Sequence, residues 1–196
     1  MRKMMISAAA FLLSAVMSGC GIYMPDKYSK AVDPYQPVND EDVRSGECTI
    51  EVGDEVNISG QGAWFGENND ILISKGGIYN ISGNLSGGIN VETQDIVKLV
   101  FVNADISNDN GYAVTSSSER LILCSDGESK LKGSGGDYGN AVYSGGSVIF
   151  SGTGSLDIDG GIFSQGKIQF GRNVSTFCEI LKTDTGELIP GLLSIN

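Results

Sequence analysis

Two stretches that share one pattern decide the fold of this chain: Asp109–Val114 reads DNGYAV and Asp137–Val142 reads DYGNAV. Both fit the pattern D-x-G-x-A-V, and a run of alternating apolar residues follows each of them. Repetition of this kind is typical of solenoid proteins, in which each repeat packs on the next. The pattern therefore predicts a series of stacked coils.

Alignment of the chain on these stretches places apolar residues at recurring positions. The first strand of a coil holds Val91, Val114, Val142 and Ile162; the second strand holds Leu99, Leu121, Val148 and Ile168 and, two residues later, Phe101, Leu123, Phe150 and Phe170; the third strand holds Ile106, Leu131 and Ile158. Repeats of roughly 20 to 27 residues with three short strands predict a parallel β-helix of about four to five coils, stacked about 4.8 Å apart. A β-sandwich is the alternative, because it also has short strands separated by frequent turns.

The repeats also predict where strands and loops lie. An insertion, Gly133–Asn140, follows the third strand of one coil, and its glycines suit corners that other residues cannot adopt. No stretch after residue 46 has a convincing apolar period of 3.6, so we expect few helices. The clearest predicted strands are Ile71–Ile73, Lys98–Val102, Arg120–Cys124, Ser147–Phe150 and Lys167–Phe170.

The start of the chain predicts export. Two basic residues precede a short apolar run, Ile6–Met17, which is too short to span a bilayer and is typical of a signal peptide. Small residues then lead to Cys20, as in the bacterial lipobox, so Cys20 is the predicted lipidation site; an ordinary secretory signal is the alternative. We expect a signal peptide over residues 1–19, a tether over 20–45 and the β-helix domain over 46–196. The predicted location is the bacterial cell envelope, at the outer membrane or cell surface.

Composition excludes several classes of function. The 13 basic and 24 acidic residues give a net charge of −11, and the chain has no histidine. An acidic chain lacks the basic patch that nucleic-acid binding requires. Without histidine, Ser/His and Cys/His catalysis and His-ligated zinc are excluded. The lipid anchor is the one membrane contact that we expect, because an acidic surface is not attracted to anionic lipid.

The cysteines do not predict a disulfide framework. Once Cys20 is lipidated, Cys48, Cys124 and Cys178 remain, an odd number with no metal-ligand spacing. We expect them to be small residues of the core or of turns. A bridge between Cys124 and Cys178 stays open.

Several segments resemble a known family. Ile71–Leu85 (ILISKGGIYNISGNL), Val97–Ile106, Gly139–Ser144 (GNAVYS) and Gly152–Asp159 (GTGSLDID) are similar to a bacterial carbohydrate-binding domain whose right-handed parallel β-helix has the shape of a pectate lyase. The resemblance runs from about residue 56 to 170. It implies a secreted or surface-attached protein that binds plant-type polysaccharides such as cellulose or polygalacturonate, with calcium. The small number of coils in this chain leaves less surface for a long glycan.

Lyase activity is not expected. A pectate-lyase mechanism needs an arginine base beside calcium-binding carboxylates on neighbouring coils. Arg120 lies at the start of a strand and Arg172 in a turn, and the sequence pairs neither of them with two such carboxylates. The chain is therefore predicted to be a non-catalytic polysaccharide-binding protein. A surface adhesive protein that binds another protein is the alternative.

The turn carboxylates are candidate calcium ligands. Asp109, Asp137 and Asp159 each precede the first strand of a coil, so stacking would bring them to one edge. Calcium takes oxygen ligands from such turns. Solvated turn residues that favour a corner are the alternative.

Aromatic residues are candidate sugar contacts, since sugar rings pack on flat aromatic faces. We expect the contacts to come from Tyr112, Tyr138, Tyr143 and Phe163, at the first-strand edge. Trp64 is predicted instead to cap the end of the helix. On the second strand, a mostly apolar outer stripe (Val100, Ile122, Ile149 and Gln169) predicts a cover, for which we favour residues 188–195 or 46–58.

Overall fold

The computed structural model describes residues 32–33, 47–137, 139–171, 175–183, 186–188 and 191–194. In this part of the chain there is no helix, and all strands join one mixed sheet. The all-β class is confirmed. Residues 1–31 and 34–46, which hold the predicted signal peptide, Cys20 and most of the tether, lie outside the described residues.

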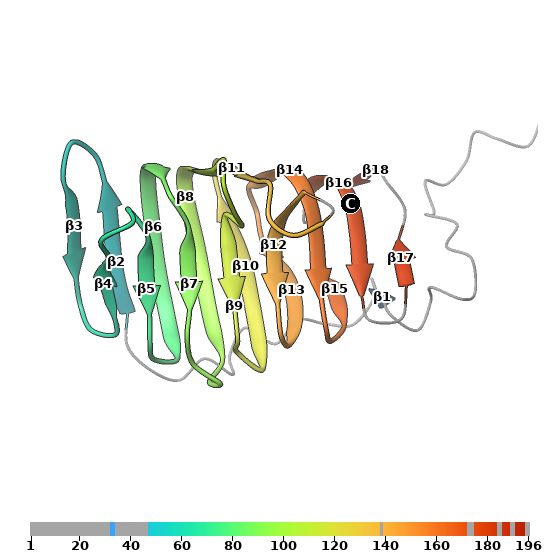
Figure 1. The fold of residues 1–196 in the computed structure, drawn as a ribbon, viewed down its shortest axis with the longest axis horizontal. Helices are drawn as coiled ribbons and strands as arrows, with labels where there is room; N and C mark the ends of the chain where they lie inside the picture. Colours follow the sequence, from blue (N-terminus) through green and yellow to red (C-terminus); the bar gives the residue numbers. More distant parts are fainter. Residues whose placement is uncertain are drawn as a thin grey trace, which may run out of the picture.

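The strands lie side by side along the long axis of the molecule, with β2 and β3 at one end and β16 and β17 at the other (Figure 1). Most neighbouring strands are parallel and come from successive repeats of the sequence. Antiparallel pairs occur at the two ends, where β3 pairs with β2, β4 with β5, and β17 and β18 with β16. This pairing differs from that of a β-sandwich, whose two sheets are antiparallel.

The pairings define three stacks of strands, numbered as in the predicted coil. The first stack consists of β4 (Ala63–Phe65), β5 (Ile71–Ile73), β7 (Ile89–Val91), β9 (Val114–Ser116), β12 (Asn140–Ser144) and the second half of β14 (Ser155–Ser164). In β5, β7 and β9 the outer two residues are buried and the middle one is half-buried. The middle residues therefore point away from the core.

The second stack is the longest. It consists of β2 (Glu47–Val52), the first halves of β6 (Gly77–Ser86) and β8 (Val97–Asn108), β10 (Arg120–Asp126), β13 (Ser147–Gly152), β15 (Ile168–Phe170) and β1 (Val32–Asp33). At one end, β3 (Val56–Ser59) pairs with β2.

The third stack holds the second halves of β6 and β8, then β11 (Glu128–Gly133), the first half of β14 and the first half of β16 (Ser175–Thr183), whose second half continues the first stack. β18 (Gly191–Ser194) pairs with the first half of β16, and β17 (Gly186–Leu188) pairs with its second half. The predicted strands and the Gly133–Asn140 insertion between β11 and β12 agree with this arrangement.

The corner between the second and third stacks depends on residues with positive φ. Gly83 (φ 87°) and Asn103 (φ 50°) bend β6 and β8, and Gly127 (φ 92°) separates β10 from β11. Asn103 tolerates this conformation better than most residues, and its Oδ1 accepts a 3.1 Å hydrogen bond from the backbone N–H of Glu128. A side chain at Gly127 would collide with the Asn103 amide. Glycine therefore leaves room for Asn103 to support the next strand.

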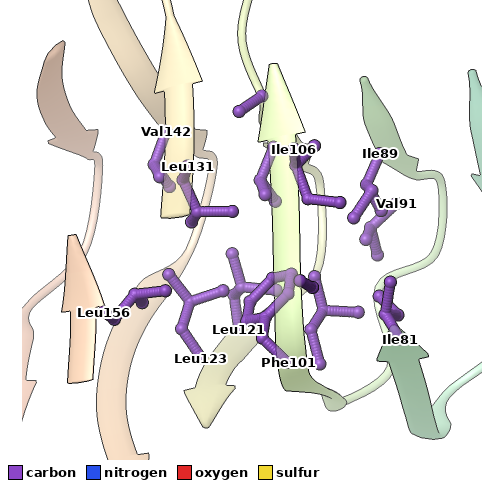
Figure 2. Packing of buried hydrophobic residues seen from close by; sticks show 14 of the residues in the cluster. Ile81, Ile89, Val91, Phe101, Ile106, Leu121, Leu123, Leu131, Val142 and Leu156 are labelled. Atoms are coloured by element: carbon purple, nitrogen blue, oxygen red, sulfur yellow. The ribbon is translucent and has the colours of Figure 1, made fainter. Parts of the chain in front are cut away.

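The core fills the space between the three stacks. Apolar side chains from all three point toward one another, among them Ile106, Leu131 and Val142 (Figure 2). Phe150 is 1% exposed, pairs in register with Leu123 and Phe170, and stacks on Phe170 with ring centroids 5.0 Å apart. The predicted burial of Phe150 between these two residues is confirmed.

The predicted alignment is wrong for the first and second strands of one coil. Leu99 pairs with Leu123 rather than Leu121, and Phe101 lies opposite Ser125. The same shift of two residues sets Ile89, not Val91, opposite Val114. Side chains in a strand alternate with a period of two, so the shift changes the partners but leaves the inner and outer faces unchanged. Phe101 stays fully buried, and so does Ser125 opposite it.

The outer stripe of the second stack is covered at its centre, because Ile122 and Ile149 are 0% and 5% exposed. The segments predicted to cover it lie elsewhere. β2 and β3 extend the sheet beyond β6, and β17 and β18 pair with β16 at the opposite end. Both predicted covers are therefore wrong, since hydrogen-bonding groups at the sheet ends hold these segments as strands. No helix in the described residues is long and apolar enough to cross a membrane.

Candidate functional site

The outward side chains of the first stack form one continuous row. Successive register pairs join Trp64 to Leu72, Leu72 to Asn90, Asn90 to Thr115, Thr115 to Tyr143, and Tyr143 to Phe163. We call these six residues the first-stack row. Residues directly opposite each other in a sheet point to the same face, and five strand spacings of about 4.8 Å give the row a length of about 24 Å. The row carries no charged side chain, and Lys182 follows Phe163 in register beyond it.

Aromatic side chains cluster at one end of this row. The Tyr143 and Phe163 rings lie parallel, with centroids 5.5 Å apart and planes 4° from parallel, and the Tyr112 ring lies 5.5 Å from Tyr143 at a tilt of 46°. The Tyr143 hydroxyl accepts a 3.1 Å hydrogen bond from Gln165 Nε2. The predicted alignment of Tyr143 with Phe163 is confirmed, and Tyr112 joins them. Tyr138, the fourth predicted aromatic contact, lies outside the described residues.

The insertion between β11 and β12 holds Tyr112 in place. A Cβ atom at Gly135 would lie 2.5 Å from the Tyr112 ring, and one at Gly136 would lie 2.7 Å from its hydroxyl. The loop backbone therefore packs directly on this tyrosine, which only glycine permits. Burial raises the pKa of the Tyr112 hydroxyl above its ordinary value, and the neighbouring Tyr143 and Asp137 raise it further. The insertion thus orders one side of the aromatic cluster.

The base of the same loop contains a buried amide. Asn140 is 4% exposed, and its backbone exchanges two hydrogen bonds with Gly135, of 2.9 Å and 2.7 Å. Among the described residues, its side-chain Oδ1 has no hydrogen-bond partner. Buried polar atoms are normally paired, so this oxygen is an exception at the base of the loop.

The middle of the row is polar and rigidly supported. Asp70 Oδ1 accepts a 2.7 Å hydrogen bond from the Gly88 N–H, and Asp70 Oδ2 accepts one of 3.2 Å from Asn90 Nδ2. Asp70 therefore orients the Asn90 amide. Thr115, the next residue along the row, is half-buried between the inward-pointing Val114 and Ser116.

Trp64 lies at the other end of the row, in β4. It is 44% exposed, and with Phe65 at 42% it is one of the two exposed large apolar residues in the described part of the chain. An indole that is nearly half exposed does not close the core. The prediction that Trp64 caps the end of the fold is therefore wrong. Sequence reasoning missed its place in the row, because β4 pairs antiparallel with β5 outside the repeat pattern.

Two of the three predicted calcium ligands, Asp109 and Asp159, lie beside lysines. Asp109 Oδ1 forms a 3.0 Å ion pair with Lys132 Nζ, and Asp159 Oδ2 lies 3.8 Å from Lys130 Nζ. The hydrogen bond to Asp109 raises the pKa of Lys132, to which Asp159 also contributes. In the part of the chain that the structure describes, no three acidic or cysteine side chains are grouped to hold a metal. At Asp109 and Asp159 a lysine ammonium group therefore lies where a bound cation would sit.

The outward side chains of the third stack also form a row, with a different chemistry. Asp105, Lys130 and Asp157 lie opposite one another in register, and we call them the third-stack row. Lys130 Nζ lies 3.7 Å from Asp157 Oδ2. These charges pair with one another along the stack.

The remaining predicted residues give no second site. Cys48 and Cys124 are free and buried, and burial raises the pKa of the Cys48 thiol, which makes it unreactive. The side chains of Cys178 and Arg172 lie outside the described residues, and the Cys124–Cys178 bridge that the sequence left open is not formed because Cys124 is free. Arg120 is half-buried at the start of β10.

Comparison with known proteins identifies the family. A family model described as "Carbohydrate-binding domain-containing protein" matches residues 67–173, more than half of the 196-residue chain. The chain belongs to this carbohydrate-binding domain family. The matched segment includes the first-stack row from Leu72 to Phe163 and ends beyond β15. The search of curated proteins and the search of solved structures gave no significant match.

Proposed function

We propose that this chain is a non-catalytic, lipid-anchored protein of the bacterial cell envelope that binds polysaccharide on the first-stack row. Membership of a carbohydrate-binding domain family supports the ligand class. The observation that carries the site is the row itself, which combines aromatic rings with an amide and a hydroxyl on one solvent-facing surface. Aromatic faces and amide or hydroxyl groups are what sugar rings and sugar hydroxyls bind.

The fold that we propose for this function is a short right-handed parallel β-helix. Three stacks of parallel strands from successive repeats support it, as do corners formed by glycine and Asn103. In such a solenoid each stack presents its own outer row, so a ligand can lie along the row across several strands.

The ligand that suits this row best is an uncharged polysaccharide. The row is neutral, while the whole chain has a net charge of −11. A polyuronate would be repelled by such a chain unless cations bridged the carboxylates. Calcium therefore stays a prediction for acidic glycans alone.

A pull-down on cellulose and on polygalacturonate, each with and without a chelator, tests this function. We expect retention on the neutral glucan in both conditions, and retention on polygalacturonate only when calcium is present. A chain that is retained on neither polymer would contradict the proposed function.

The anchor has a separate test in bacteria. Replacement of Cys20 by Ser removes the predicted acylation site and should move the protein from the membrane fraction to the soluble fraction, with loss of incorporated labelled fatty acid. A Cys20→Ser protein that stays in the membrane fraction would contradict lipid anchoring and leave the glycan site unaffected.

A further inference from the structure

Trp64 is more exposed than the Tyr143 and Phe163 rings of the aromatic cluster at the other end of the row. In the cluster, Tyr143 and Phe163 are half-buried and lie parallel, so part of each ring face is turned toward the other ring. Trp64, by contrast, is 44% exposed and is the one tryptophan among the 196 residues. Its indole offers a larger open face than any ring of the cluster.

The register places this indole on the same outer face as the cluster. Trp64 lies opposite Leu72, and Leu72 lies between the buried Ile71 and Ile73. Phe65, the neighbour of Trp64, lies opposite Ile71 and so belongs to the inward register. The alternation therefore assigns Trp64, and not Phe65, to the ligand face.

The residues between the two aromatic ends suit a chain of sugars. Asn90, oriented by Asp70, and Thr115 provide hydrogen-bonding groups at successive strands. Each strand adds about 4.8 Å, so the distance from Trp64 to Tyr143 is about 19 Å. A monosaccharide or disaccharide cannot contact both ends, whereas a longer linear glycan can.

We propose that the binding site extends along the whole first-stack row and holds a linear, uncharged oligosaccharide, with Trp64 and the Tyr143–Phe163 pair contacting its two ends. This inference rests on the proposed function and adds the direction of the glycan, its minimum length and a binding residue. The glycan lies along the stack, perpendicular to the strands, and affinity rises with length until both ends are occupied.

Isothermal titration of the full chain with cellobiose, cellotetraose and cellohexaose tests the extended site. We expect affinity to increase with length in the unaltered chain. Trp64→Ala should weaken cellohexaose binding about tenfold, the loss of one aromatic contact, and so reduce the gain in affinity from cellobiose to cellohexaose. Phe65→Ala is the matched control, because it removes an equally exposed ring from the adjacent, inward position and should leave both affinities unchanged. Thermal unfolding of both variants verifies that each is folded.

Fluorescence gives a second readout on the unaltered protein, since all tryptophan emission comes from Trp64. Saturating cellohexaose should protect Trp64 from acrylamide quenching, and cellobiose should protect it much less. Unchanged quenching with bound cellohexaose, or a Trp64→Ala variant with the cellohexaose affinity of the parent, would overturn the extended site while the proposed function stands. If the unaltered chain binds none of the glycans, both proposals fail.

Discussion

On the outer face of the third stack, Asp105, Lys130 and Asp157 alternate in charge. On the outer face of the first stack, the row from Trp64 to Phe163 carries no charge. Both rows have the same spacing, because both follow strands of the same repeats. In the third-stack row Lys130 forms an ion pair with Asp157, so these charges are already paired within the protein. In the first-stack row the polar groups and rings face solvent, which is the condition for binding a ligand.

The core beneath both rows should give the largest effect on stability. Phe150 is 1% exposed and stacks on Phe170, so Phe150→Ala should lower the free energy of unfolding by about 3 to 5 kcal/mol. Chemical denaturation measures the change. A variant as stable as the parent would mean that the two rows do not share this core.

The insertion supports the first-stack row alone, so a change there should separate the two faces. At Gly135 a Cβ atom would lie 2.5 Å from the Tyr112 ring. Gly135→Ala should therefore displace Tyr112 and cost about 1 to 3 kcal/mol, with weaker glycan binding. Gly139→Ala is a control in the same loop, as it meets nothing within 4 Å, although its φ of 63° adds some strain. Equal glycan binding by the Gly135→Ala variant and the parent would show that Tyr112 is not part of the site.

Charge reversal in the third-stack row should have a smaller effect. Lys130→Glu places three acidic residues opposite one another and removes ion pairs at 3.7 and 3.8 Å. These side chains are 41 to 51% exposed, so solvent screening limits the loss to about 0 to 1 kcal/mol. The melting temperature should fall at low salt and recover in part at high salt. A neutral effect at low salt would contradict the register of this row.

Alkaline pH should affect the aromatic cluster slightly. The pKa of Tyr112 is raised above its ordinary value of 10.0 in the folded protein, first by burial. Because the folded state favours the protonated hydroxyl, Tyr112 contributes fully to the free energy of unfolding below pH 10. That contribution is lost as the pH rises through the folded-state pKa. In a spectrophotometric titration of the parent we expect a tyrosine that ionises at higher pH than an ordinary tyrosine. The Tyr112→Phe variant should lack this ionisation. Titration of Tyr112 at its ordinary pKa would mean that the loop does not cover the ring.

The sequence contained enough to predict the strands, the inner and outer faces, and the register everywhere except for the first and second strands of one coil. Leu121, Leu123, Val148 and Phe150 recur with a strand period of two, and that period survives a shift of two residues. The shift at Phe101 could not be foreseen, because β8 turns its corner at Asn103 where the next repeat uses Gly127.

The site was predicted in part for a similar reason. Tyr143 and Phe163 occupy equivalent positions of the repeat, so alignment alone brought them together. Trp64 lies in an antiparallel strand outside the repeat, and nothing in the pattern marks its partner Leu72. The lysines that pair with Asp109 and Asp159 come from β11, where Lys132 lies opposite Asp159 in register, and the sequence analysis did not consider them.

The most direct test compares glycan binding after matched changes on the two faces. One double variant, Tyr143→Ala with Phe163→Ala, removes the stacked pair from the first-stack row. The other, Lys130→Ala with Asp157→Ala, removes an ion pair from the third-stack row. Affinity for a soluble neutral glucan should fall more than tenfold in the first variant and stay at the parent value in the second, with both proteins folded. Equal affinities for the parent and the Tyr143/Phe163 variant, or a loss confined to the Lys130/Asp157 variant, would contradict the assignment of the first stack as the sugar-binding face.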